Sequence, residues 1–272
     1  MKHFTIILSF IIFFSNPISA TKHTHDDPNE IRYVKEEIRL NDKLQSSLRS
    51  QNAWQNFLIE NPNWFTYFNE YNYKPHRAFG SPIKLNSSGS TKDKIDFFIS
   101  NSLSEFNLPD NLFLDNKNSN SKFKHFNYSQ RFNNLDVIDS RLYIKLSLND
   151  EIISFGLDVY SDINISVVPT ISSEQAIISA CNNLSFPIIS SEIEDNLKVL
   201  PIPFEGKYLY KLVFLINVKT SIAEGPANYL CYVDANSGEL LMRKNKVVYE
   251  APQPSTVNIK GNVFTSHPYN PT

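Results

Sequence analysis

The sequence predicts an α+β protein: an N-terminal helical segment followed by two small units, each an antiparallel sheet with a helix. Three patterns predict this class. Apolar residues recur at helical spacing in residues 31–60 and again in 95–106. Apolar and polar residues alternate over residues 142–159, as in a sheet with one buried face. A new helix start at Ser172 then precedes further strand-like runs.

The composition allows one large or two modest domains. The chain has 272 residues, of which 41% are hydrophobic and 20% charged. Its formal net charge of −2 gives no reason to expect nucleic acid or an anionic membrane surface as a partner.

The first residues have the features of a secretory signal. Lys2 is followed by an apolar run over residues 4–14, and small residues precede the expected cleavage between Ala20 and Thr21. We therefore expect residues 1–20 to be a signal peptide and the protein to be secreted and extracellular, with a retained membrane anchor as the alternative. No later stretch is apolar enough to span a membrane, so no transmembrane segment is expected after cleavage.

Residues 21–60 form a polar leader and a helical segment that stops at Asn61-Pro62. The first unit is expected over residues 61–168. It begins with an aromatic-rich strand over 64–71 and a turn-rich connection over 74–83. Thr91 is the expected N-cap of a helix whose apolar stripe runs to Phe106. Strands follow over 122–132, 142–148 and 153–159, with one more possible over 161–168.

The second unit is expected over residues 169–249. Ser172 and Gln175 have the spacing of a capping box, so a helix begins there. A strand over 208–218 and a hairpin over 229–246, with its turn from Asp234 to Gly238, complete the order helix, strand, strand, strand. Residues 250–272 have the composition of a linker and the start of a further, missing domain.

No catalytic constellation occurs in the sequence. The six histidines include no His-Glu-x-x-His pair, and no Gly-x-Ser-x-Gly elbow, phosphate-binding glycine loop or Cys-x-x-Cys pair is present. We therefore expect no catalytic residue, cofactor or metal ligand in this chain, which points to a secreted non-catalytic protein.

Several residues have both a functional and a structural interpretation. Cys181 and Cys231 are either a disulfide or two small buried residues. His125 is either a ligand or a structural histidine within a strand. Trp64 and its aromatic neighbours are either a sugar-binding platform or part of a sheet core. Arg77, with Phe79 and Gly80, either anchors a partner or forms a structural ion pair.

Three stretches, taken in order, resemble a known family. They are Pro75-His-Arg-Ala-Phe-Gly80 with the preceding aromatic strand, residues 125–137 around Gln130, and the hairpin Val233-Asp-Ala-x-x-Gly238. Together they are similar to the pro-region of secreted zinc metallopeptidases of the fungalysin and thermolysin type. That region is a fungalysin/thermolysin propeptide domain followed by a PepSY-type domain. The matching motif residues are Arg77, Gly80, Gln130, Asp234 and Gly238. Asn134 and Asp136 depart from the glycine and proline that are common in the family.

The resemblance implies a role as intramolecular chaperone and inhibitor of a catalytic domain that is absent from this chain. The implied partner is the cognate metallopeptidase catalytic domain, in cis or in trans, and zinc is expected only in that domain. One alternative is a freestanding secreted module that binds peptides or surfaces. Another is an enzyme with an unfamiliar site, which clustered and strongly perturbed titratable groups in a deep pocket would indicate.

Overall fold

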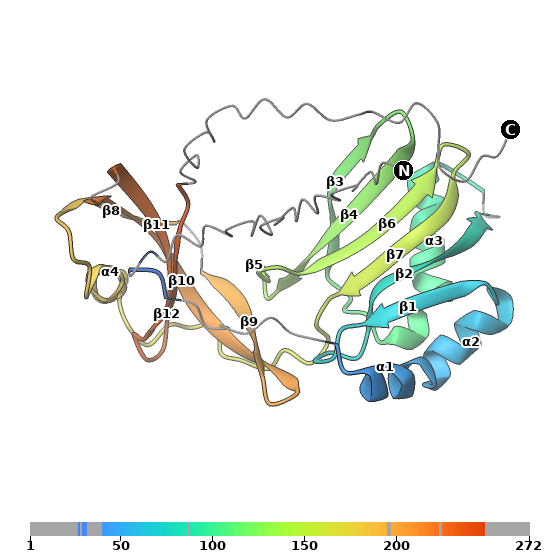
Figure 1. Cartoon of the computed structure of the whole chain (residues 1–272), viewed down its shortest axis with the longest axis horizontal. Coiled ribbons are helices and arrows are strands. Elements are labelled where there is room, and N and C mark those ends of the chain that lie inside the picture. The colour runs from blue at the N-terminus through green and yellow to red at the C-terminus, as the bar shows by residue number, and fades with distance from the viewer. Residues whose placement is uncertain are drawn as a thin grey trace, which may run out of the picture. The chain divides into compact units, whose positions relative to one another are not determined.

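Two antiparallel sheets and four α-helices make up the part of the chain that the computed structural model describes, which confirms the α+β class (Figure 1). The described residues are 27, 29–31, 40–85, 88–194, 197–222 and 225–247. Within this part, no helix is long and apolar enough to cross a membrane. The predicted signal peptide, its cleavage site at Ala20 and Thr21, and the predicted linker over 250–272 lie outside the described residues.

The helices are α1 (Asp42–Arg49), α2 (Asn52–Glu60), α3 (Thr91–Ser102) and α4 (Ser173–Cys181), with a short 3-10 helix η1 (Ser104–Phe106). The expectation of one helix over residues 31–60 is wrong in two respects: residue 31 is not helical, and residues 42–60 form two helices. Asn41 Oδ1 accepts the backbone N–H groups of Lys43 and Leu44 and so begins α1. Gln51 is extended and separates α1 from α2. Similarly, the cap of α3 is Ser90 and not Thr91.

The first sheet has seven strands in the order β1-β2-β7-β6-β4-β3, with β5 paired to β4. All the pairings are antiparallel. The strands are β1 (Trp64–Phe68), β2 (Pro75–Lys84), β3 (Leu112–Ser119), β4 (Phe123–Phe132), β5 (Leu135–Asp136), β6 (Arg141–Ser147) and β7 (Glu151–Asp158).

The core of this sheet lies between one of its faces and the helices α1, α2 and α3. Leu142, Ile144 and Leu146 of β6 are fully buried, as their alternation predicted, and they belong to one cluster with Trp54, Phe57, Ile95 and Phe98 of the helices. We call this helix-packed side the covered face and the opposite side the open face. The alternation slips in β7, where Ile152 is buried in place of Ile153, because the pairing with β6 is irregular at Lys145 and Leu146.

Two expectations for the first unit are wrong. Residues 74–83 are not a connection but most of β2, the strand next to β1. Pro75 is tolerated there because it is the first residue of the strand. Residues 161–168 form no strand, and these described residues instead lead irregularly toward α4.

The second sheet has five strands, all antiparallel, in the order β12-β11-β10-β8, with β9 paired to β10. The strands are β8 (Ile188–Ile193), β9 (Lys198–Phe204), β10 (Lys207–Ile222), β11 (Gly225–Asp234) and β12 (Leu240–Asn245). The hairpin expected over 229–246 is β11 and β12. The sequence predicted only three strands after the helix, so it missed β8 and β9. β9 contains Pro201 and Pro203, two residues that are unusual in a strand. The two prolines are two residues apart, so the backbone positions where they lack an N–H group lie on the same side of β9. The strand can therefore still pair with β10.

The helix α4 begins with the predicted capping box. Ser172 Oγ accepts the N–H of Gln175 at 3.3 Å, and Gln175 Oε1 accepts the N–H of Ser172 at 2.9 Å. Ala176 and Ala180 of α4 are fully buried against β10 and β11.

The start of the described chain also belongs with this second sheet. Ile31 pairs with Arg243 of β12 through two backbone hydrogen bonds of 2.9 and 3.0 Å. The buried Arg243 guanidinium donates to the carbonyl oxygens of Asn29, Ala180 and Asn182. Residues 29–248 accordingly form one compact unit, in which Asn69 Nδ2 of the first sheet region donates to Tyr208 Oη of the second at 3.0 Å.

Candidate functional site: the open face of the first sheet

Four of the five motif residues serve the fold directly, and Gly80 shows how. A Cβ atom at Gly80 would lie 2.5 Å from the backbone oxygen of Asn63 and from the ring of Trp64. No larger residue fits without moving β1, because real Cβ contacts are not that short. Gly80 therefore allows the close approach of β2 to the start of β1.

Gln130 holds the chain that leaves the first sheet. Its side chain is buried, with Oε1 accepting the N–H of Tyr160 at 2.8 Å and Nε2 donating to the carbonyl oxygen of Tyr160 at 2.5 Å. One amide thus satisfies both backbone groups of a buried residue that has left the strand ladder.

Asp234 and Gly238 build the turn between β11 and β12. The buried Asp234 carboxylate accepts the N–H groups of Asn236 and Ser237 at 2.8 and 3.2 Å and an ion pair from Lys211 at 2.8 Å. These contacts lower the pKa of Asp234 although burial alone would raise it. Gly238 has φ +76°, which glycine adopts without strain.

Arg77 differs from the other four because it projects from the open face. Its guanidinium lies 5.8 Å from the centre of the Phe79 ring, and among the described residues it has no ion-pair partner. The structural ion pair considered for Arg77 is therefore absent from the described part of the chain. The alternative, a residue that anchors a partner, fits its position.

Arg77 lies beside three exposed aromatic rings at one end of the open face. Phe65 and Tyr67 of β1 and Phe79 of β2 have ring centres 5.2, 6.0 and 6.5 Å apart, and each is about two-fifths exposed. Trp64, the residue singled out from the sequence, points the other way into the core, where its ring stacks on Phe155 at 5.5 Å. The aromatic run thus divides between a core and a surface cluster, and the exposed members are the neighbours of Trp64.

A shallow hollow of about 530 Å³ crosses the middle strands of the same face. We call it the basic hollow, because no aspartate or glutamate is among the side chains that line it. Its lining consists of His76, Arg77, Phe79, His125, Asn127, Arg141, Tyr143, Lys145, Ile153 and Ser154.

The floor of the basic hollow is shaped by Tyr143 lying over Gly156. A Cβ at Gly156 would lie 2.2 Å from the Tyr143 ring and 2.3 Å from the carbonyl oxygen of His76. The ring can occupy this position only because residue 156 is glycine, which has no side chain. The guanidinium of Arg141 in turn lies 4.9 Å from the centre of the Tyr143 ring.

His76 is the rim residue with a defined charge partner. Its Nδ1 lies 2.9 Å from both carboxylate oxygens of Asp158, which also accepts a hydrogen bond from Asn69. The hydrogen bond to Asp158 raises the pKa of His76, against the opposing effects of burial and of Arg141 and Arg77. His76 is therefore protonated over a wider pH range than an ordinary histidine, and the Asp158 carboxylate balances its charge.

His125 also lines the basic hollow, in contact with Phe123 at a ring-centre distance of 6.4 Å. No group of three or more His, Cys, Asp or Glu that could hold a metal ion occurs in the described part of the chain. The lining role of Arg141, Tyr143 and Lys145 was missed from the sequence. The signal was present, since they occupy the alternate positions of the strand whose other residues were predicted to be buried.

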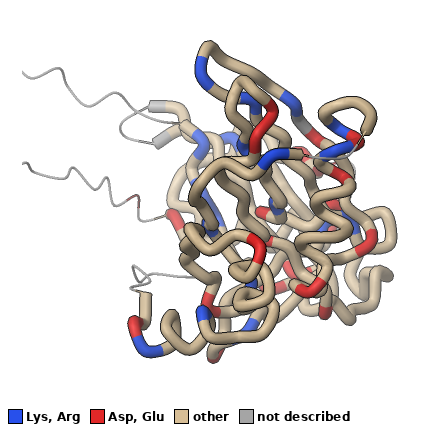
Figure 2. Tube along the Cα trace, turned by 90° about the vertical axis from the view of Figure 1, so that its right-hand side faces the viewer, with Lys and Arg blue, Asp and Glu red and all other residues tan. Residues whose placement is uncertain are grey.

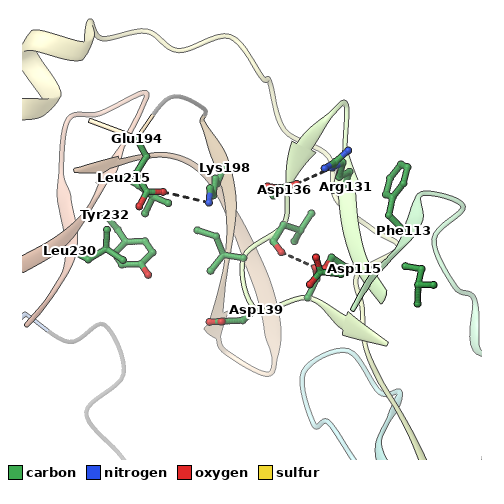
Figure 3. A pocket seen from close by; sticks show the side chains of 15 residues that line it. Phe113, Asp115, Arg131, Asp136, Asp139, Glu194, Lys198, Leu215, Leu230 and Tyr232 are labelled. Atoms are coloured by element: carbon green, nitrogen blue, oxygen red, sulfur yellow. Dashed lines mark hydrogen bonds and ion pairs between the residues drawn. The ribbon is translucent and has the colours of Figure 1, made fainter. Parts of the chain in front are cut away.

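A second hollow, of about 550 Å³, is lined by charges of both signs (Figure 3). Acidic and basic side chains both line it, and four of these side chains are neutralised in two ion pairs, Arg131 with Asp136 at 2.9 Å and Lys198 with Glu194 at 3.5 Å. This internal pairing leaves it with less unbalanced charge to offer a ligand than the basic hollow has.

The two cysteines lie in the core of the second sheet and are free thiols in the structure. Cys231 Sγ is 3.8 Å from the carbonyl oxygen of Ala180, the residue before Cys181. Burial raises the pKa of the Cys231 thiol to about 11 and also raises that of Cys181, so neither is an activated nucleophile. A disulfide between them stays a prediction.

Comparison with known proteins gives no family assignment. No protein-family model matches the sequence, and no curated protein matches it significantly. Among solved structures, the Bacillus megaterium YpeB C-terminal domain aligns with 77% of this chain and 99% of its own length, at 13% sequence identity and a TM-score of 0.30. A match at this level shows neither a shared family nor a shared function.

Proposed function

We propose that this chain is the pro-region of a secreted zinc metallopeptidase precursor and acts as a chaperone and inhibitor of a catalytic domain that lies outside this chain. The observation that supports a binding role is the open face, where exposed aromatic rings adjoin cations that have no ion-pair partner among the described residues. The specific partner rests on the motif resemblance, in which a propeptide domain precedes a PepSY-type domain.

The composition of the open face suits binding to another protein. Tyrosine, phenylalanine and arginine are enriched in protein interfaces, and tyrosine and arginine are frequent among the residues that dominate the binding energy. Phe65, Tyr67, Phe79 and Arg77 provide such a group on two neighbouring strands. Strands held rigidly by a packed core on their other face lose little freedom on binding.

Binding of this kind accounts for both parts of the proposed role. A partner that contacts only the native state of a peptidase stabilises that state by mass action, which assists folding. The same contact restrains the peptidase for as long as it persists. In this proposal zinc binds only to the catalytic domain, and the chain contributes no catalytic group.

The test is inhibition in trans. The secreted chain, residues 21–272, is added to the zinc endopeptidase encoded with it, and the initial rate of cleavage of a quenched fluorescent peptide is measured against the concentration of the chain. We expect saturable inhibition, weakened about tenfold or more in a Tyr67→Ala/Phe79→Ala variant because two contact residues are removed. Phe97→Ala is the matched control, since Phe97 is an exposed phenylalanine on α3, away from the open face.

Undiminished proteolysis at saturating amounts of the chain would count against the proposed function. Equal inhibition by the wild type and the Tyr67→Ala/Phe79→Ala variant would keep the function and reject the open face as its surface. Circular dichroism and thermal melting of each variant show whether it is folded.

A freestanding binding module is the second candidate. The observation that favours it is that the open face is built within residues 64–158 of this chain, without any downstream domain. The reading frame beyond the codon for Thr272 separates the two candidates. A continued frame with a His-Glu-x-x-His motif supports the pro-region, and a stop codon supports the module.

A further inference from the structure

We propose that the basic hollow binds an acidic polypeptide segment of the partner, with its carboxylates on Arg77, Arg141 and Lys145. This deepens the proposed function by stating the chemistry of the partner, and it rests on that function only for the partner's identity. It starts from the absence of carboxylates among the lining side chains, in a chain whose net charge is −2.

The three cations of the basic hollow have no ion-pair partners among the described residues. Elsewhere in the described chain, basic side chains are often paired, as Lys124 is with Asp150 at 2.7 Å and Lys211 with Asp234 at 2.8 Å. Figure 2 likewise shows basic and acidic residues interspersed along the chain. The basic hollow therefore departs from a surface on which charges are mostly mixed, and its positive charge is available to a ligand.

The cations are held against aromatic rings and not against carboxylates. Lys145 Nζ lies 3.7 Å from the centre of the Phe123 ring, and the Arg141 guanidinium lies 4.9 Å from that of Tyr143. A ring restricts the position of a cation without using its hydrogen-bond donors. The N–H groups of Arg141 can therefore donate to a carboxylate in the two-pronged geometry that arginine favours, and the side chain has less conformational entropy left to lose on binding.

The aromatic cluster at the end of the face adds a requirement for the segment. Arg77 belongs to both features, since it lines the hollow and lies against Phe79. A segment whose carboxylates lie on the hollow would bring an adjacent apolar side chain onto Phe65, Tyr67 and Phe79. We therefore expect clustered carboxylates next to an aromatic or aliphatic residue.

A protein segment fits the basic hollow better than a nucleic acid does. Nucleic-acid binding draws its affinity from many phosphate contacts and is opposed by a negative overall charge. The hollow has three permanent cations and the whole chain is slightly acidic. A short acidic segment needs only these few contacts.

The test uses a short synthetic peptide in which glutamate alternates with serine around one phenylalanine, carrying a neutral dye for fluorescence anisotropy. The matched peptide has glutamine in place of each glutamate. We expect the acidic peptide to bind the chain about tenfold or more tightly than its glutamine counterpart, and to lose affinity as salt is raised. Equal binding of the two peptides would overturn the proposal.

Variants locate the binding. Arg141→Gln/Lys145→Gln removes two cations of the hollow, and we expect it to weaken the acidic peptide about tenfold or more. Lys43→Gln/Lys92→Gln removes the same charge from exposed positions on α1 and α3 and is expected to change affinity less than about twofold. Equal losses in the two double variants would mean that only the net charge matters, which contradicts a built site.

Two further outcomes separate this inference from the proposed function. If the acidic peptide binds and the chain does not inhibit the peptidase, the basic hollow is still a site for acidic segments, but the proposed pro-region role is wrong. If the Arg141→Gln/Lys145→Gln variant inhibits as well as the wild type and the peptide does not bind, the inference fails and the pro-region role stands. A single-stranded oligonucleotide that binds more tightly than the peptide would also overturn the choice of a protein segment.

Discussion

The two faces of the first sheet are made by the same strands and have opposite chemistry. On β6, the covered face takes Leu142, Ile144 and Leu146, while the open face takes Arg141, Tyr143 and Lys145. Both sets follow from one alternation, since successive side chains of a strand point to opposite sides. The apolar side chains of the covered face are buried by the helices that pack on it. The open face has no such cover among the described residues.

The comparison separates residues that maintain the fold from residues that are free to bind. Removing a side chain from the covered face is expected to cost stability, and removing one from the open face is expected to cost binding. Substitutions on the two faces therefore test this division, and the effect on stability is expected to be largest on the covered face.

The largest effect is expected at Phe155, at the centre of the covered face. Its ring contacts those of Phe57, Trp64 and Phe98 at centre distances of 5.4, 5.5 and 6.0 Å and is fully buried. Phe155→Ala should lower the free energy of unfolding by about 3–5 kcal/mol, from lost burial and the cavity left behind. Phe79→Ala on the open face should lower it by less than about 1 kcal/mol. Urea denaturation followed by circular dichroism measures both, and equal losses would contradict the division.

A smaller loss is expected at Gln130, a polar residue on the covered side. In Gln130→Met the N–H and carbonyl of Tyr160 lose their partner, which should cost about 2–4 kcal/mol, because buried backbone groups would be left unsatisfied. Gln55→Met is the control, since Gln55 is an exposed helical glutamine whose backbone contact can be replaced by water. The same denaturation experiment applies, and a loss at Gln130 no larger than at Gln55 would show that the amide pair is not stabilising.

Sequence patterns predicted the covered face well because burial leaves a periodic trace. The stripes in α3 and β6 and the capping box of α4 follow from local rules, and the structure has all three. The errors fall where tertiary contacts decide. β2 was taken for a connection because of its prolines and glycine, yet Gly80 is there to let β1 approach. Residue 31 was assigned to a helix, yet it pairs with Arg243, more than two hundred residues away.

The open face was harder to predict because nothing local records which exposed residues share a surface. Arg77 of β2 and Lys145 of β6 line one hollow only because β7 lies between their strands, and strand order is not visible in the sequence. The motif Pro75–Gly80 did point to Arg77. It could not show that, unlike the other four motif residues, Arg77 has no role in packing the core.

The smallest effect is expected from pH at His76, on the rim of the open face. Asp158 raises the folded-state pKa of His76 above its unfolded value of about 6.5, so the stabilisation is complete below that value and is lost as pH rises through the folded pKa. Because the His76 side chain is more than half exposed, the contribution should stay below about 1 kcal/mol. The difference in unfolding free energy between wild type and His76→Gln should therefore be larger near pH 5.5 than near pH 8.5. A difference that grew with pH instead would mean that Asp158 and its neighbours stabilise the neutral ring, so that His76 would become charged only under more acidic conditions than an ordinary histidine.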